Sequence, residues 1–106
     1  MTVVERIHAS GKRLYSHPYR LYVLDHEGEG AVQTVISVPK KIFKRAVRRN
    51  LVRRRIREAL RLLKTEFPEM GTKDMLIVYV STEILEYGKI VDGLRNALGK
   101  ILKDPS

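Results

Sequence analysis

The sequence contains no cysteine, and it has no long hydrophobic run. Without cysteine there is neither a disulfide nor a thiolate metal site. No apolar segment approaches the roughly 20 residues that span a bilayer, so we expect no membrane association. The start of the sequence, MTVVERIHASGKR, also lacks the apolar stretch of a signal peptide. We therefore expect a cytoplasmic protein.

Sequence patterns of self-sufficient catalysis are also missing. There is no Gly-rich phosphate loop and no G-x-S-x-G, and the three histidines are scattered without ligand spacing. The acids Asp25, Glu27 and Glu29 are typical of a solvated turn rather than a magnesium site. A nuclease acting alone would need such carboxylates or a general base near a phosphate. We therefore predict no catalytic residues and no metal ligands in this chain, which favours a binding protein.

Positive charge, in contrast, is concentrated in one segment. The 25 residues from Lys40 to Lys64 hold 12 of the 21 basic residues and a single acid, Glu58. The rest of the chain has 9 basic and 11 acidic residues, so the formal charge of +9 is local. Like charges without counter-charges repel one another, and a polyanionic partner relieves that repulsion.

The pattern of hydrophobic residues predicts a single α+β domain over residues 1–106. Extended structure is expected from Arg13 to Asp25, with the main strand starting near Pro18, and again from Ala31 to Val38. The acids and glycines of 25–30 indicate a turn between them. The run MLIVYV after Asp74 is typical of a strand covered on both faces. Residues 1–11 are compatible with one or two helical turns ending at Gly11.

Two main helices complete this expectation. In the basic segment, apolar residues at a spacing of three to four form one arc, namely Val52, Ile56, Ala59, Leu60 and Leu63. A closing helix is expected from Glu86 to Lys103, and Gly88, Gly93 and Gly99 weaken it. The order strand, strand, helix, strand, helix predicts a small, mostly antiparallel sheet of three to four strands packed with these helices.

The basic helix also contains the pattern R-N-x-x-R-R-x-x-R-E, which is formed by Arg49, Asn50, Arg53, Arg54, Arg57 and Glu58. Ala46-Val47, Lys40-Lys41 and the strand end Ser37-Val38 precede it. Together these residues resemble the signature of the protein subunit of bacterial ribonuclease P. The pattern there is S-V-x-K-K followed by A-V-x-R-N-x-x-K-R-x-x-R-E. The order of the remaining elements is similar over nearly the whole chain.

The resemblance implies a specific role and an unusual topology. The family's protein assists a catalytic RNA that removes 5′ leaders from precursor tRNA, and the RNA holds the magnesium ions. The protein binds that RNA and holds the single-stranded leader in a cleft of the sheet and the basic helix. We expect it to be monomeric outside the holoenzyme. The family fold also contains a left-handed β-α-β crossover, against the usual right-handed rule.

The chain departs from the family pattern at four places. Arg53 replaces a lysine, which keeps the charge and adds a planar set of donors. The stretch between Lys41 and Ala46 is one residue longer, with Phe43-Lys44 where glycine is common. His8 stands where a leader-facing phenylalanine often lies, and an arginine after the last strand is missing around Val80.

Candidate contact residues follow from the charge pattern and the resemblance. Guanidinium groups bind phosphate bidentately, and an asparagine can contact base edges or sugars. The cations before the helix lie near its N-terminus, which itself attracts phosphate. We expect Glu58 to orient Arg54 or Arg61. The predicted RNA-binding residues are Lys40, Lys41, Lys44, Arg45, Arg48, Arg49, Asn50, Arg53, Arg54, Arg57 and Arg61.

Three tyrosines are candidates for the leader site. Alternation with a period of two places Tyr15 and Tyr19 on one face of the extended segment and Tyr22 on the other. Packing in the core of a sheet is the ordinary role of such residues. Given the resemblance, at least one of the three is expected to stack on a leader base, since aromatic rings bind single strands in this way. Tyr79 and Tyr87 are expected to be structural.

Two other classes of function fit the charge. A ribosomal or architectural RNA-binding protein would share the basic segment but would take no part in cleavage. A DNA-binding domain would place its helix in the major groove, but here strands rather than a helix-turn-helix flank the basic helix. The identity of the RNA that binds the protein would distinguish these classes.

Overall fold

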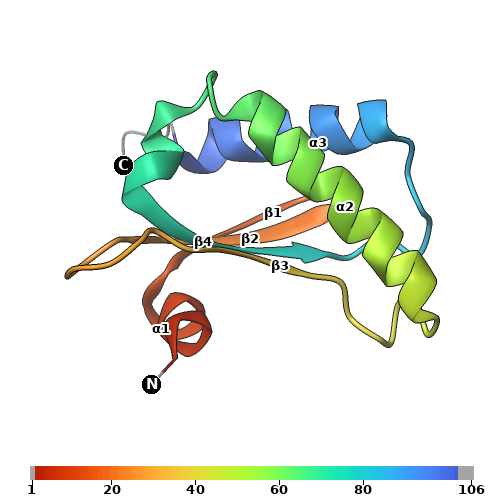
Figure 1. Ribbon diagram of the computed structural model, residues 1–106, viewed down its shortest axis with the longest axis horizontal. Helices are drawn as coiled ribbons and strands as arrows, with labels where there is room; N and C mark the ends of the chain where they lie inside the picture. Colours follow the sequence, from red (N-terminus) through yellow and green to blue (C-terminus); the bar gives the residue numbers. More distant parts are fainter. Residues whose placement is uncertain (1, 103–106) are drawn as a thin grey trace.

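The computed structural model describes residues 2–102 and has an α+β architecture (Figure 1). It confirms the expected class, and the helical turns expected before Gly11 form a short N-terminal helix. The elements in chain order are α1 (Val3–Ser10), β1 (Lys12–Ser16), β2 (Tyr19–Asp25), β3 (Thr34–Ser37), α2 (Ala46–Leu63), the 3₁₀ helix η1 (Pro68–Thr72), β4 (Lys73–Tyr79) and α3 (Tyr87–Leu102). The closing helix was expected to reach Lys103, which lies outside the described residues.

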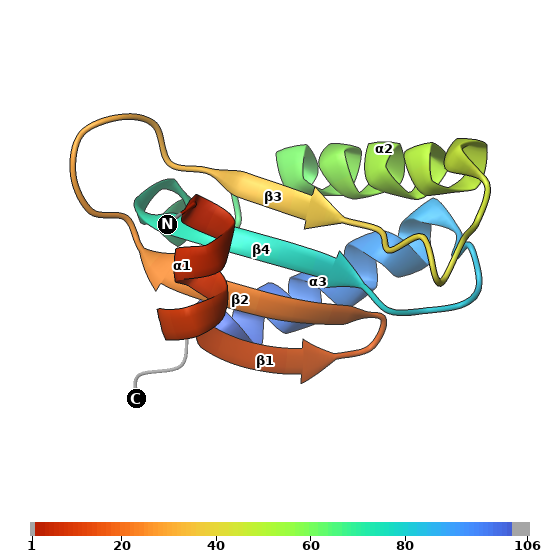
Figure 2. The same ribbon diagram turned by 90° about the horizontal axis from the view of Figure 1, so that it is seen from below.

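The four strands form one mixed sheet in the order β1-β2-β4-β3. The β1–β2 and β2–β4 pairs are antiparallel, and β3 and β4 are parallel. Helices α2 and α3 cover one face of the sheet, whereas α1 lies on the other (Figures 1 and 2). Figure 2 views the sheet from the side of α1, so α2 lies on the far side of the sheet, next to the edge strand β3. This arrangement makes the β3-α2-β4 crossover left-handed, as the resemblance implied.

Helix α2 packs as the sequence pattern predicted. Its buried residues are Val52, Ile56, Ala59, Leu60 and Leu63, which are the five residues of the predicted apolar arc. They meet the inward-facing residues of the sheet and of α3 in one core, including Leu21, Ile77, Leu94 and Leu98. This burial fixes which side of α2 faces the solvent.

The extended segment from Arg13 to Asp25 is a hairpin rather than a single strand. Ser16 pairs with Tyr19 across a turn made by His17 and Pro18. Residues directly opposite in an antiparallel pair point to the same face, and Tyr15 pairs with Arg20. Tyr15 therefore shares a face with Tyr22 and not with Tyr19, so the predicted grouping of the tyrosines is wrong. The turn at His17 and Pro18 interrupts the alternation of side chains between the two faces of the sheet. Counting through the turn as if the strand were continuous therefore places Tyr15 on the wrong face.

A buried carboxylate connects the N-terminal helix, the β2–β3 loop and β4. Asp74 is 1% exposed. Its carboxylate accepts a hydrogen bond from the backbone N–H of Gln33 at 2.8 Å and lies 3.0 Å from Nδ1 of His26. Arg6 of α1 approaches it to 3.7 Å. Burial alone would raise the pKa of the Asp74 carboxyl, but the contacts with Gln33, His26 and Arg6 outweigh it and lower that pKa.

The lowered pKa of Asp74 predicts an acid-sensitive contribution to stability. A carboxyl with a depressed folded-state pKa stabilises the fold at neutral pH, and this stabilisation is lost as the pH falls below about 4. Asp74→Asn should therefore lower the free energy of unfolding at pH 7 by about 1–3 kcal/mol, since an amide cannot replace every contact. Urea unfolding of both proteins between pH 7 and pH 3 measures this. The difference should shrink with acid, and a constant difference would contradict the assignment.

Close packing between α3 and the β1–β2 turn requires a glycine. A Cβ at Gly93 would lie 2.9 Å from Cδ of Pro18 and 3.1 Å from Cε2 of Tyr19, whereas a Cβ at Gly99 has no heavy atom within 4 Å. Of the three glycines that weaken this helix, Gly93 thus has a packing role.

These contacts predict opposite effects for two identical substitutions in α3. Gly93→Ala should destabilise the protein by about 1–3 kcal/mol, because the added methyl group overpacks the turn. Gly99→Ala, its matched control, should stabilise by up to about 1 kcal/mol through helix propensity. Thermal unfolding of the two variants tests this, and stabilisation by both would show that the Gly93 contact is unimportant.

Candidate nucleic-acid interface

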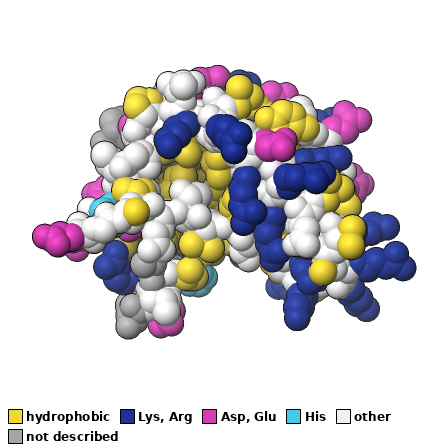
Figure 3. Space-filling model, viewed as in Figure 1, with side chains coloured by type: hydrophobic (Ala, Val, Ile, Leu, Met, Phe, Trp, Pro, Cys, Tyr) yellow, Lys and Arg dark blue, Asp and Glu magenta, His cyan; other side chains and the backbone are white. Residues whose placement is uncertain are grey.

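The solvent side of α2 carries a dense group of unneutralised cations. Asn50, Arg54, Arg57, Arg61 and Lys64 follow one another at a spacing of three or four and are all exposed. Within residues 2–102, no Asp or Glu forms an ion pair with any cation of the segment 40–64. Figure 3 shows Lys and Arg side chains gathered over α2. The structure thus presents one strongly positive ridge, suited to a polyanion.

Glu58 does not have the role that we expected. It is exposed, and no ion pair joins it to Arg54 or Arg61 in the described part of the chain. The helical spacing allows such a pair, but water solvates both partners and the gain is only about 0.2–0.5 kcal/mol. The arginines of the ridge are therefore available to another partner.

Side-chain contacts within the protein involve three residues of the signature, namely Arg49, Asn50 and Arg53. Arg49 donates from one guanidinium nitrogen to the carbonyl oxygens of Phe43 and Lys44, at 2.8 and 2.9 Å. Arg53 donates to Oδ1 of Asn50 at 3.0 Å. Arg49 thus fastens the loop before α2, and it has donors left for a ligand because a guanidinium carries five. The sequence did not reveal this role, because the acceptors are backbone atoms.

The loop between β3 and α2 projects four of the five remaining predicted cations, and the fifth, Arg48, is exposed in the first turn of α2. Phe43 is 5% exposed, and its ring stacks on that of Tyr79 with centroids 6.2 Å apart. The phenylalanine of the longer loop therefore serves as its anchor. Around it the side chains of Lys40, Lys41, Lys44 and Arg45 are exposed. They lie beside the N-terminus of α2, which has no acidic residue in its first turn and no side-chain cap.

Two features of α2 were not anticipated from the sequence. Arg55, outside the predicted set, donates to the carbonyl oxygen of Leu85 at 2.7 Å and ties α2 to the β4–α3 connection. Val47 is 78% exposed on the cationic side. With Asn50, Leu51 and Arg54 it lines a shallow cavity of about 400 Å³. Val47 and Leu51 form an apolar pair at i and i+4 outside the buried arc, and this pair is the sequence pattern that indicates the apolar surface.

The three candidate tyrosines have different environments. Tyr19 is fully buried, and its hydroxyl donates to the carbonyl oxygen of Ile90 at 3.0 Å. Burial, with Tyr79 nearby, raises the pKa of its phenol. A base cannot stack on Tyr19 without opening the core, so the structure contradicts the prediction that Tyr19 contacts the leader. The cause is the hairpin, which turns Tyr19 toward α3.

Tyr22 and Tyr15 lie on the opposite face of the sheet. Tyr22 is 4% exposed, since it packs with Ile7 and Leu76 and the imidazole of His8 stacks on its ring, with centroids 4.8 Å apart. Tyr15 is 60% exposed at the rim of a cavity of about 320 Å³, which Arg13 and Arg20 also line. An open aromatic ring beside two guanidinium groups is a suitable platform for a single nucleic-acid strand.

Between residues 2 and 102, no three His, Cys, Asp or Glu side chains lie together as a metal site would require. Within that range no helix has the length and apolarity needed to cross a membrane.

Tyr79 is structural, as expected, because its hydroxyl donates to the carbonyl oxygen of Glu83 at 2.6 Å. Tyr87 is 37% exposed at the start of α3.

Comparisons with known proteins agree with the geometry. The sequence model of the family described as Ribonuclease P matches residues 4–103. The ribonuclease P protein component of Porphyromonas gingivalis is 41% identical over 63 residues, which are 58% of this chain and 46% of that protein. This alignment thus covers less than half of the length of that relative.

Solved structures of similar shape extend the likeness over the fold. The RNase P protein of Staphylococcus aureus has a TM-score of 0.78 at 26% identity, covering 94% of this chain and 88% of that one. The RNase P protein of Thermotoga maritima has a TM-score of 0.79 at 23% identity, covering 93% and 91%. The second likeness, at this low identity, concerns the fold alone.

Proposed function

The chain belongs to the ribonuclease P protein family, and we propose that it is the protein subunit of that ribonuclease. In this role it binds the catalytic RNA and the single-stranded 5′ leader of precursor tRNA. It thereby assists the cleavage that produces the mature 5′ end. The observation that carries the proposal is the cationic side of α2, where none of the arginines is neutralised by an acid of residues 2–102.

The chemistry of cleavage is assigned to the RNA. Metal-assisted phosphodiester hydrolysis needs carboxylates or other oxygen ligands held close together. The described residues offer no such group, so they do not fit a magnesium site, and we propose that the magnesium ions are held by the RNA subunit. The protein contributes cations that neutralise phosphates and a surface that orients the substrate. Outside the holoenzyme it acts as a monomer.

The catalytic RNA is assigned to the cationic side of α2 and the loop before it. Arg54, Arg57 and Arg61 are exposed and aligned along the helix, and they make no ion pair with an acid of residues 2–102. Their guanidinium groups can donate two hydrogen bonds to the oxygens of one phosphate. Asn50, at the start of the same row, can add a contact with a base or a sugar. Arg49 contributes chiefly by holding the lysines of the loop in place.

The leader is assigned to the face of the sheet opposite α2. The resemblance implied a cleft of the sheet and the basic helix instead, but Tyr15, the exposed one of the three candidate tyrosines, lies on the other face. Tyr15 offers an exposed ring, and Arg13 and Arg20 lie beside it to neutralise phosphates. Tyr22 takes part only if the imidazole of His8 is displaced or itself meets the base, since the two rings are stacked. The α1 side of the sheet is thus assigned to the substrate, and α2 to the catalytic RNA.

Cleavage assays test the proposed function. The protein alone should not cleave precursor tRNA at any magnesium concentration, because it lacks a cluster of metal ligands in residues 2–102. Mixed with a bacterial ribonuclease P RNA, it should increase the rate of cleavage at the mature 5′ end. Sequencing the RNA that copurifies with the protein distinguishes the alternative of a ribosomal or architectural protein. Ribosomal RNA in that fraction, together with no stimulation of cleavage, would refute the proposal.

Binding of the catalytic RNA should depend on the exposed arginines of α2. Arg57→Ala should weaken binding by about 1–3 kcal/mol, since a charge-assisted contact is lost. The slope of log K against log salt should become shallower by about one unit. Lys100→Ala removes the same charge from an exposed site on α3 and should leave both values nearly unchanged. Equal effects of the two substitutions would mean that only net charge matters.

Recognition of the leader should depend on Tyr15. Tyr15→Ala should weaken binding of precursor tRNA by the holoenzyme about 5- to 150-fold, the equivalent of one stacked base at roughly 1–3 kcal/mol. Binding of mature tRNA should not change. Because Tyr15 is 60% exposed, the melting temperature should hardly move. Tyr87→Ala, at a partly exposed tyrosine of α3, is the control. Equal losses for both tRNAs would remove Tyr15 from the leader site.

A further inference from the structure

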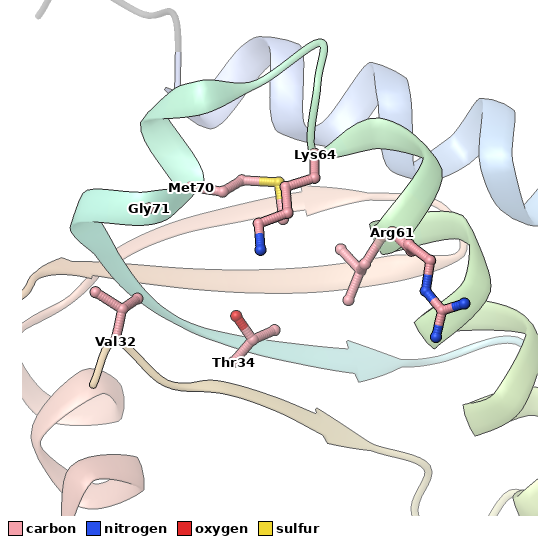
Figure 4. A pocket seen from close by; sticks show the side chains of 7 residues that line it. Val32, Thr34, Arg61, Lys64, Met70 and Gly71 are labelled. Atoms are coloured by element: carbon pink, nitrogen blue, oxygen red, sulfur yellow. The ribbon is translucent and has the colours of Figure 1, made fainter.

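An open cavity lies between the C-terminal half of α2, the edge strand β3 and η1. It has a volume of about 370 Å³, and residues of all three elements line it. Figure 4 shows the side chains around this space, with Val32 and Thr34 below and Lys64 and Met70 above. The volume lies within the range of small-ligand sites. None of the contacts assigned above to RNA uses this cavity, apart from Arg61 at its rim.

The lining combines an apolar surface with positive charge. Leu60 and Met70 are 8% and 9% exposed and form the apolar part with Val32. The exposed side chains of Arg61 and Lys64 stand at the rim and make no hydrogen bond or ion pair within the described chain. The space-filling view shows a hollow with hydrophobic side chains inside and Lys and Arg side chains around it (Figure 3). A flat, weakly polar group that carries a negative charge would match both parts.

Polar groups inside the cavity can recognise such a ligand. The hydroxyl of Thr34 and the ammonium of Lys64 point toward the same space in Figure 4. A hydroxyl both donates and accepts, whereas an ammonium only donates. A nucleobase, with acceptors and donors on its edge and an apolar face, satisfies this set.

The position of the cavity selects the source of the ligand. Arg57, Arg61 and Lys64 follow at i, i+4 and i+7, so the rim continues the cationic row of α2. Thr34 belongs to the face of the sheet that α2 and α3 cover, whereas Tyr15 lies on the other face. An RNA that follows α2 reaches the cavity directly, and a leader strand held at Tyr15 does not.

We propose that this cavity binds one unpaired nucleotide of the catalytic RNA. The base lies against Val32, Leu60 and Met70, and the adjoining phosphate is neutralised by Arg61 and Lys64. The contact extends the RNA interface beyond the signature residues to the end of α2. The proposal rests on the proposed function, because it takes the ligand from the RNA bound along α2.

Filling the cavity tests the proposal without removing any charge. A Cβ at Gly71, on the cavity wall, has no heavy atom within 4 Å, so a larger side chain is accommodated. Gly71→Leu should weaken binding of ribonuclease P RNA about 5- to 150-fold, as expected when one base loses its apolar contact. Gly88→Leu on α3, where a Cβ also meets no atom within 4 Å, is the matched control and should bind normally. Melting temperatures of both variants show that the fold is retained.

Crosslinking identifies what lies in the cavity. The chain has no cysteine, so Gly71→Cys creates a unique site for a short photoreactive reagent. In the assembled holoenzyme with precursor tRNA, the crosslink should map to one short unpaired stretch of the catalytic RNA. The same reagent at Gly88→Cys should give no such crosslink.

Each alternative result overturns the proposal. A crosslink to precursor tRNA would mean that the cavity belongs to the substrate site. Normal affinity of Gly71→Leu, while Arg57→Ala still weakens binding, would show that the cavity is empty in the complex and would leave the proposed function intact. Failure of the unmodified protein to bind the RNA or to stimulate cleavage would instead refute the proposed function itself.

Discussion

The packing of the apolar arc of α2 on the sheet and α3 is the constraint on which the rest of the structure depends. Helix α2 carries arginine on every turn, and each close pair of like charges costs about 0.2–0.5 kcal/mol. Burial of a Val, Ile or Leu side chain returns about 1.5–3 kcal/mol, and four of the five buried residues are of these types. Hydrophobic burial therefore outweighs the repulsion. It also fixes the rotation of the helix, and with it the direction of the cations.

The same sheet separates two surfaces. Its helical face holds the core and, at the β3 edge, the cavity beside Arg61 and Lys64. Its other face is covered by α1 at one end and leaves Tyr15 exposed at the other. Asp74 keeps α1 and the β2–β3 loop attached to β4. The two proposed sites, for the catalytic RNA and for the leader, therefore share no residue.

The sequence-based expectations were correct where they rested on the period of a single helix or strand, and wrong where they depended on a turn, a loop or a side-chain pair. The arc of α2 and the strand after Asp74 were predicted correctly, because helical and extended periods are local. The leader role of Tyr19 was wrong, since the phase of β2 depends on a turn that the alternation does not reveal. Glu58 does not form the expected ion pair with Arg54 or Arg61. Arg49 donates to the backbone carbonyls of the loop before α2, and the positions of these carbonyls are defined only once the loop is folded.

The sequence by itself determined that the segment 40–64, which contains one amphipathic helix, would carry most of the positive charge, and which residues of that helix would be buried. Both follow from residue order within a few turns. Tertiary structure decided the left hand of the β3-α2-β4 crossover and the pairing of Tyr15 with Arg20. It also decided the close approach of Gly93 to the β1–β2 turn and the cavity at the end of α2. Apart from the pairing of Tyr15 with Arg20, which a two-residue turn brings together, these features join segments that are distant in the sequence. Their contacts depend on how separate elements pack, and local periodicity carries no record of that packing.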